Sequence, residues 1–99
     1  MLEKLRSADF APYLNQRFDV HYGGAEPLGV ELIEVTDLKS RGGNPEHRPP
    51  FSIVFRGPKD ILLPQKIYRL EHEKMGTLEI FLVPIMPDKQ GLRYEAIFA

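Results

Sequence analysis

Three histidines are the side chains of this sequence best suited to proton exchange near neutral pH or to metal binding through nitrogen. We expect His21 and His72 to alternate away from the apolar face of two separate strands, while His47 lies in a polar loop. No two of them show the short spacing of a preformed metal site. We therefore expect solvated or structural histidines, with neither a metal nor a cofactor.

Nucleophilic chemistry has equally little support in the sequence. The chain has no cysteine, which excludes a thiolate nucleophile, a thiolate metal site and a disulfide. Ser7 precedes a short helical segment as a cap, and Ser40 lies in the polar loop. Ser52 is expected to face outward from a strand without the glycines of a nucleophile elbow. The sequence therefore predicts a protein that is not an enzyme.

The elements that would position any site are mostly strands, because apolar residues recur at every second position in six segments. Short connections rich in turn residues predict that the last three strands form hairpins. The apolar face switches halfway along the second segment, which predicts a bulge or strong bend there. The expected strands are residues 18–22, 28–36, 51–57, 66–73, 76–86 and 92–99.

Ninety-nine residues suffice for one domain with a single core, so residues 1–99 are predicted to fold together. Residues 1–16 form a short helical N-terminal segment, and residues 38–50 form a long loop rich in Gly and Pro. An open six-stranded sheet would leave two edges able to recruit other chains. We predict a small antiparallel barrel of about six strands, with a two-sheet β-sandwich as the alternative.

The segment GTLEIFLVPIM, residues 76–86, is apolar on both faces, whereas a barrel interior can use only one. If Leu78, Ile80 and Leu82 point inward, Phe81, Val83 and Ile85 point outward; the reverse arrangement is the alternative. The N-terminal helix is expected to cover part of this surplus, and another subunit the rest. A two-fold homodimer is the simplest solution. The predicted interface residues are Phe81, Val83, Ile85 and Ile97.

Two further groups are candidates for contact or structure. The loop of residues 38–50 exceeds the length needed to join two strands, which favours a second contact surface, with a disordered connector equally compatible. Its candidate residues are Arg41, His47 and Arg48. At the end of the third strand, Gly57 permits a backbone conformation that other residues resist. There Arg56 is expected to bond barrel-end carbonyls or to form a structural ion pair with Glu71 or Glu95, with recognition of a partner as the less favoured alternative.

Charge and hydropathy restrict the possible partners and location. Thirteen basic and fourteen acidic side chains give a net charge of −1, which provides no long-range electrostatic attraction to nucleic acid or anionic lipid. No apolar run approaches the ~20 residues that span a bilayer, and the first ten residues contain no apolar run typical of a signal peptide. We expect a cytoplasmic protein without a membrane partner. A small-ligand barrel and, less favoured, a nucleic-acid-binding barrel remain as alternatives.

Several motifs occur in a fixed order along the chain. They are Phe51, Phe55 to Pro58, Leu63 to Gln65, Tyr68 to His72, Phe81 to Pro84 and Tyr94 to Ala96. In this pattern the chain resembles the DUF6916 family of small bacterial β-domains, with Ile80 in place of an expected leucine. The resemblance implies no activity and at most a link to phage-tail-like or surface assemblies. We predict a structural or protein-interaction module, a homodimer that can also bind a larger structural protein.

Overall fold

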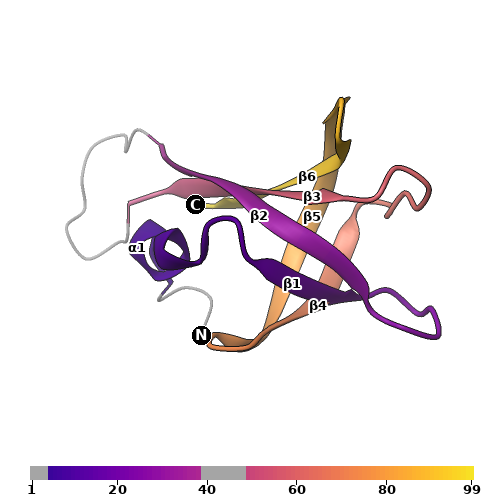
Figure 1. The fold of residues 1–99 in the computed structure, drawn as a ribbon. Coiled ribbons are helices and arrows are strands. Elements are labelled where there is room, and N and C mark those ends of the chain that lie inside the picture. Colours follow the sequence, from indigo (N-terminus) through magenta and orange to yellow (C-terminus); the bar gives the residue numbers. More distant parts are fainter. Residues whose placement is uncertain (1–4, 39–48) are drawn as a thin grey trace.

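The computed structural model describes residues 5–38 and 49–99 of the chain (Figure 1). Its elements are α1 (Ser7–Phe10), the 3₁₀ helix η2 (Ala11–Tyr13), β1 (Arg17–His21), β2 (Leu28–Asp37), β3 (Phe51–Gly57), β4 (Lys66–His72), β5 (Gly76–Asp88) and β6 (Gly91–Phe98). All six strands lie where the alternation of apolar residues predicts them, with ends shifted by at most two residues.

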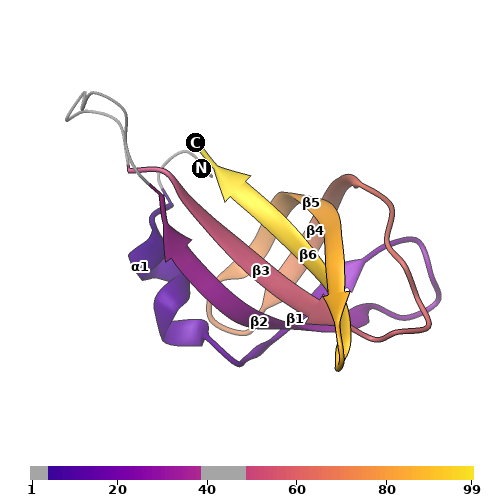
Figure 2. The same cartoon turned by 90° about the horizontal axis from the view of Figure 1, so that it is seen from above.

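The strands close into a barrel in the order β1-β2-β3-β6-β5-β4, and every neighbouring pair is antiparallel. The barrel predicted from the sequence is thus confirmed over the sandwich. Figure 2 shows β2, β3 and β6 side by side, with β4 and part of β5 behind them. Closure satisfies the sheet edges that an open sheet would expose.

Strand β5 makes closure possible because it changes partner along its length. Its first seven residues, 76–82, pair with β4, and residues 83–88 pair with β6. A register shift between Ile85 and Asp88 accompanies the second half. A second shift, between Leu32 and Glu34, confirms the bulge predicted from the switch of apolar face in β2.

Aromatic side chains fill one end of the barrel. Phe10 is fully buried, with its ring centroid 5.9 Å from that of Phe51 and 5.6 Å from that of Phe98. The rings of Phe51 and Phe98 stack at 4.6 Å. Each buried phenylalanine contributes about 1.5–3 kcal/mol relative to an exposed one. From Leu5 onward the N-terminal segment therefore plugs the barrel end, whereas the sequence led us to expect that it would cover part of the outer face of β5; residues 1–4 lie outside the described part of the chain.

Local contacts fix this N-terminal segment. Its helix begins at Ser7 with Arg6 as the N-cap, and the carboxylate of Asp9 accepts a hydrogen bond from the Arg6 backbone N–H at 2.8 Å. Ser7 is thus the first helical residue and not the cap. After η2, the backbone N–H of Asn15, at a φ of 69°, donates to the carbonyl of Leu32 at 2.6 Å. The segment is thereby tied to β2.

The opposite end of the barrel is closed by the connection between β3 and β4. Leu63 is 1% exposed, and its backbone N–H donates to the hydroxyl of the buried Tyr94 at 3.0 Å. That hydroxyl donates in turn to the carbonyl of Ile61 at 3.3 Å, and the Tyr68 hydroxyl donates to the carbonyl of Pro64. Burial raises the pKa of Tyr94 above its usual value of 10.0.

Candidate functional site

The outer face of β5 carries the predicted interface, and the structure bears out its orientation. Ile80 and Leu82 are buried, at 2% and 0% exposure, whereas Phe81 between them is 49% exposed. Val83 and Ile85 are half-buried. Each has a charged register neighbour on β6, which leaves Phe81 as the strongly exposed member of the three.

Ile97 is 64% exposed but does not join Phe81 in one ladder. Its register partner is Ser52 on β3, and the ladder between β5 and β6 begins only at Val83. The two strands diverge away from their shared hairpin (Figure 1). The structure therefore places Ile97 on a neighbouring part of the outer face, while Phe81 belongs to the β4–β5 part.

Sequence reasoning missed the residue that completes this surface. Ile67 on β4 is 61% exposed and is the direct register partner of Phe81. Two large apolar side chains thus adjoin on the outer face, which we call the β4–β5 face. The signal was present in the alternation of β4, because Ile67 is out of phase with the buried Tyr68 and Leu70.

The outer face of β3 differs from the β4–β5 face because its outward residues Ser52 and Val54 are buried. Val54 and Ser52 alternate with the inward residues of β3, yet they are only 4% and 7% exposed. Val54 lies in register between Glu34 on β2 and Glu95 on β6. Val54 therefore adds no exposed apolar group to the surface, and Ser52 is too enclosed to be an accessible nucleophile.

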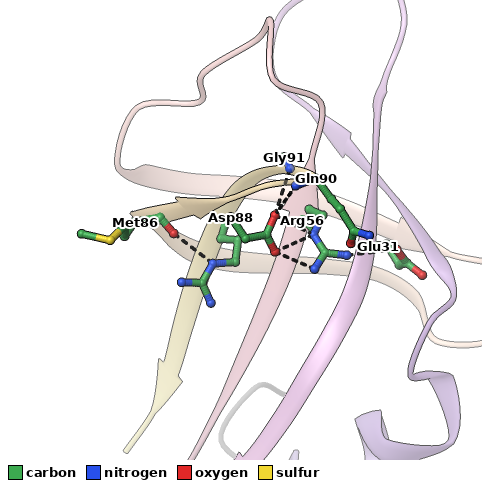
Figure 3. A network of polar contacts seen from close by, with 7 residues as sticks. Glu31, Arg56, Met86, Asp88, Gln90 and Gly91 are labelled. Atoms are coloured by element: carbon green, nitrogen blue, oxygen red, sulfur yellow. Dashed lines mark hydrogen bonds and ion pairs between the residues drawn. The ribbon is translucent and has the colours of Figure 1, made fainter.

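At the end of β3, Arg56 forms a different ion pair from the one predicted (Figure 3). Its Nε and Nη2 donate to Asp88 Oδ2 at 2.9 and 2.6 Å, and Nη1 lies 3.9 Å from Glu31 Oε1. Glu95 lies in mid-strand opposite Val54, so it is no barrel-end partner. Glu71 pairs instead with His21, whose Nε2 lies 2.7 Å from Glu71 Oε1.

Asp88 is the centre of this cluster. Its Oδ1 also accepts hydrogen bonds from the backbone N–H groups of Gln90 and Gly91, at 2.9 and 3.0 Å. Hydrogen bonding from Arg56 lowers the pKa of Asp88 from 3.8 to about 2, and these backbone donors act in the same direction. The pKa of Arg56 is raised by the same contact. The cluster ties β3 to the β5–β6 turn, which agrees with a structural role.

Two glycines pack closely at this end of the barrel. A Cβ added to Gly91 would clash with the carbonyl oxygen of Gly57, and one added to Gly57 would lie 3.2 Å from Val30 Cγ1. Gly57 has no positive φ, so the prediction that it supplies an unusual backbone conformation is wrong. Close packing between strands is the physical reason for glycine there.

His72 also differs from its expected position, because it is 6% exposed and points inward. Its ring lies 4.5 Å from those of Tyr13 and Phe18. Nε2 lies 2.8 Å from Gln16 Oε1, and Nδ1 accepts hydrogen bonds from backbone N–H groups of the next turn. Every polar atom of the ring is engaged, so His72 is structural. Within the described part of the chain, no three His, Asp or Glu side chains gather as a metal site.

An open groove of about 520 Å³ runs beside the Arg56 cluster. Its charged lining is Arg17, Glu31 and Arg56, and the guanidinium of Arg17 lies so close to Gly29 that a Cβ there would clash. Arg17 Nε lies 2.7 Å from Asp19 Oδ1. Both arginines of the groove are thus already neutralised by carboxylates of the chain.

The predicted contact residues Arg41, His47 and Arg48 lie outside the described residues. The two ends of the loop that contains them are joined by a hydrogen bond from the backbone N–H of Leu38 to the carbonyl of Pro50, at 2.9 Å. Over residues 5–38 and 49–99, no helix has the length and apolar character needed to cross a bilayer.

Comparison with known proteins adds a family to this geometry. No curated protein and no solved structure gives a significant match. The family described as "Domain of unknown function (DUF6916)" matches residues 5–98, which is nearly the whole chain. The chain belongs to this family.

Proposed function

We propose that this chain is a non-enzymatic protein-interaction module whose contact surface is the β4–β5 face. One observation carries the proposal: Ile67 and Phe81 are register partners, and both are about half exposed or more. Isolated apolar side chains are common on protein surfaces, whereas adjoining ones mark contact sites. The barrel does not require a phenylalanine at position 81, because Ile80 and Leu82 already supply the inward side of β5.

The two rival functions have weaker support. A ligand-binding barrel needs internal space, but buried aromatic and aliphatic side chains occupy the interior and its two ends. A nucleic-acid-binding barrel needs several basic side chains able to reach phosphates. Arg17 and Arg56 instead bind carboxylates, and the Nε of Arg93 donates to the carbonyl of Met86 at 2.9 Å. Arg69 is exposed, but its register partner is the acidic Glu79.

For the biological setting, the proposal follows the family resemblance. It describes an accessory of a phage-tail-like or surface assembly, made in the cytoplasm of a bacterial cell, where the module would bind a larger structural protein. An accessory of this kind needs a stable scaffold and one exposed apolar surface that can bind another protein. The filled barrel and the β4–β5 face meet that requirement.

The experiment is capture of partners from a native lysate by the tagged chain, read by mass spectrometry. Phe81→Glu places a charge on the β4–β5 face and should abolish capture. Met86→Glu is the matched control, because Met86 is 78% exposed and lies on β5 near the other hairpin. Both variants should keep the wild-type melting temperature. Equal capture by wild type and Phe81→Glu would reject the β4–β5 face as the contact surface.

A further inference from the structure

Two opposite charges lie directly beside the apolar pair of the β4–β5 face. Arg69 and Glu79 are register partners two residues away from Ile67 and Phe81, and both are exposed. In the part of the chain that the structure describes, neither side chain has an ion-pair or hydrogen-bond partner. The other arginines on the outer face of the sheet are engaged: Arg17 with Asp19, Arg56 with Asp88, and Arg93 with a backbone carbonyl.

The register fixes how these four side chains are arranged on the surface. Ile67 lies beside Phe81, and Arg69 lies beside Glu79 about 6.6 Å further along the strands, since outward residues recur every second position. The apolar pair and the charged pair therefore form two successive rungs. Each rung has one residue on β4 and one on β5, with the positive charge on β4 and the negative charge on β5.

This pattern is complementary to itself under one particular two-fold rotation. An axis parallel to the strands and midway between them lays β4 of one copy over β5 of another. Ile67 then faces Phe81 of the second copy, and Arg69 faces Glu79 of the second copy, each contact occurring twice. An axis across the strands would instead lay β4 over β4 and β5 over β5, so Arg69 would never face Glu79 of the second copy.

We infer that the occupant of the β4–β5 face is a second copy of this chain, packed face to face about a two-fold axis parallel to β4 and β5. The inference rests on the proposed contact surface and names its partner. Charge complementarity selects both the partner and the axis. A standard interface buries about 800 Å² per partner, whereas only two strands of a convex barrel meet here. The dimer is therefore expected to be weak and to dissociate on dilution.

Sedimentation equilibrium over a concentration series tests the inference on the full chain. The wild type should move from the monomer mass of 11.4 kDa toward twice that value. Arg69→Glu and Glu79→Arg each set like charges opposite one another twice, and each should weaken association about tenfold. Lys89→Glu, in the exposed β5–β6 turn, should leave it unchanged.

Mixing the two weakened variants provides the decisive comparison. In a mixed dimer, Glu at position 69 of one copy faces Arg at position 79 of the other, and the second contact pairs the native Glu79 with the native Arg69. The mixture should therefore associate about tenfold more tightly than either variant alone. An arrangement within one chain cannot produce this rescue. A mixture no tighter than its components would overturn the proposed axis.

Failure of this inference is distinguishable from failure of the proposed function. A wild-type chain that stays monomeric at the highest concentration overturns the second copy as the occupant. If Phe81→Glu still abolished capture of another protein in that case, the β4–β5 face would remain a contact surface for that protein. Conversely, rescue in the mixture with no effect of Phe81→Glu on capture would keep the dimer and reject the role of this face in binding other proteins.

Discussion

The two turns that bound β5 are closed by the same hydrogen-bond pattern with different chemistry. In each turn, one side-chain acceptor at the end of a strand takes hydrogen bonds from the backbone N–H groups two and three residues further along. The donors are Lys74 and Met75 for His72 Nδ1, at 3.0 and 3.2 Å, and Gln90 and Gly91 for Asp88 Oδ1, at 2.9 and 3.0 Å. One acceptor is a carboxylate and the other an imidazole.

The difference follows from burial. Asp88 keeps 30% of its side chain exposed and has Arg56 as a cationic partner, so it can stay charged. His72 lies between two aromatic rings, where an unpaired carboxylate would be costly. A neutral imidazole accepts at Nδ1 and donates from Nε2 to Gln16 Oε1. The same turn geometry thus uses a charged acceptor at the surface and a neutral one inside the barrel.

Replacing His72, the buried acceptor, should have the largest effect on the free energy of unfolding. His72→Ala leaves two backbone N–H groups and Gln16 without their partner and removes a ring packed between Tyr13 and Phe18. We expect a loss of about 3 kcal/mol in the free energy of unfolding, measured by urea denaturation. His21→Ala is the control: it breaks only a surface pair with Glu71 and should change stability by less than about 0.5 kcal/mol. Equal losses in the two variants would contradict the structural role of His72.

Replacing the surface acceptor should have a smaller effect, because water can reach the donors that it leaves behind. Asp88→Ala loses the turn and Arg56 contacts together, whereas Asp88→Asn keeps an acceptor oxygen for the turn and loses the charge. We expect urea midpoints in the order wild type, Asp88→Asn, Asp88→Ala, with all three above that of His72→Ala. Asp88→Asn falling below Asp88→Ala would show that the turn bonds contribute nothing.

The loss of stability at acidic pH should depend on the protonation of Asp88. Its pKa is lowered from 3.8 to about 2, so the folded state favours the charged carboxylate. The resulting stabilisation is present above about pH 4 and is lost as the pH falls from 3.8 toward 2. The difference in urea midpoint between the wild type and Asp88→Asn should therefore shrink across that interval. A difference that stays constant from pH 5 to pH 2 would contradict the charged pair with Arg56.

The strands and their closure were readable from the sequence because burial on one face imposes alternation. The same rule oriented Phe81 correctly and predicted the bulge in β2. It also contained the answer for His72, which shares its phase with the inward Tyr68 and Leu70. The expectation that His72 points outward was thus an error in applying the rule, since two-residue periodicity places it inside.

The partner of Arg56 could not be read in this way. Asp88 reaches it only because β3 pairs with β6, β6 pairs with β5, and a register shift follows Ile85. Each step is a long-range choice of register that local alternation leaves open. The destination of Phe10 is similar: its apolar character requires burial, but only the closed barrel determines that it fills an end and not the outer face of β5.

Replacing Gln16, the hydrogen-bond partner of His72 Nε2, should have the smallest effect on the free energy of unfolding. It tests whether Gln16 or the backbone of the turn fixes the tautomer of His72. Gln16 is exposed, and its side chain makes one hydrogen bond to Nε2, so Gln16→Ala should cost about 0.5–1 kcal/mol. The tautomer should not change, because the two backbone donors at Nδ1 still require an unprotonated nitrogen there. Nitrogen chemical shifts of the ring, measured by NMR, should show the proton on Nε2 in both proteins. A shift of the proton to Nδ1 in Gln16→Ala would mean that Gln16, and not the turn, sets the chemistry of His72, and the parallel with Asp88 would then fail.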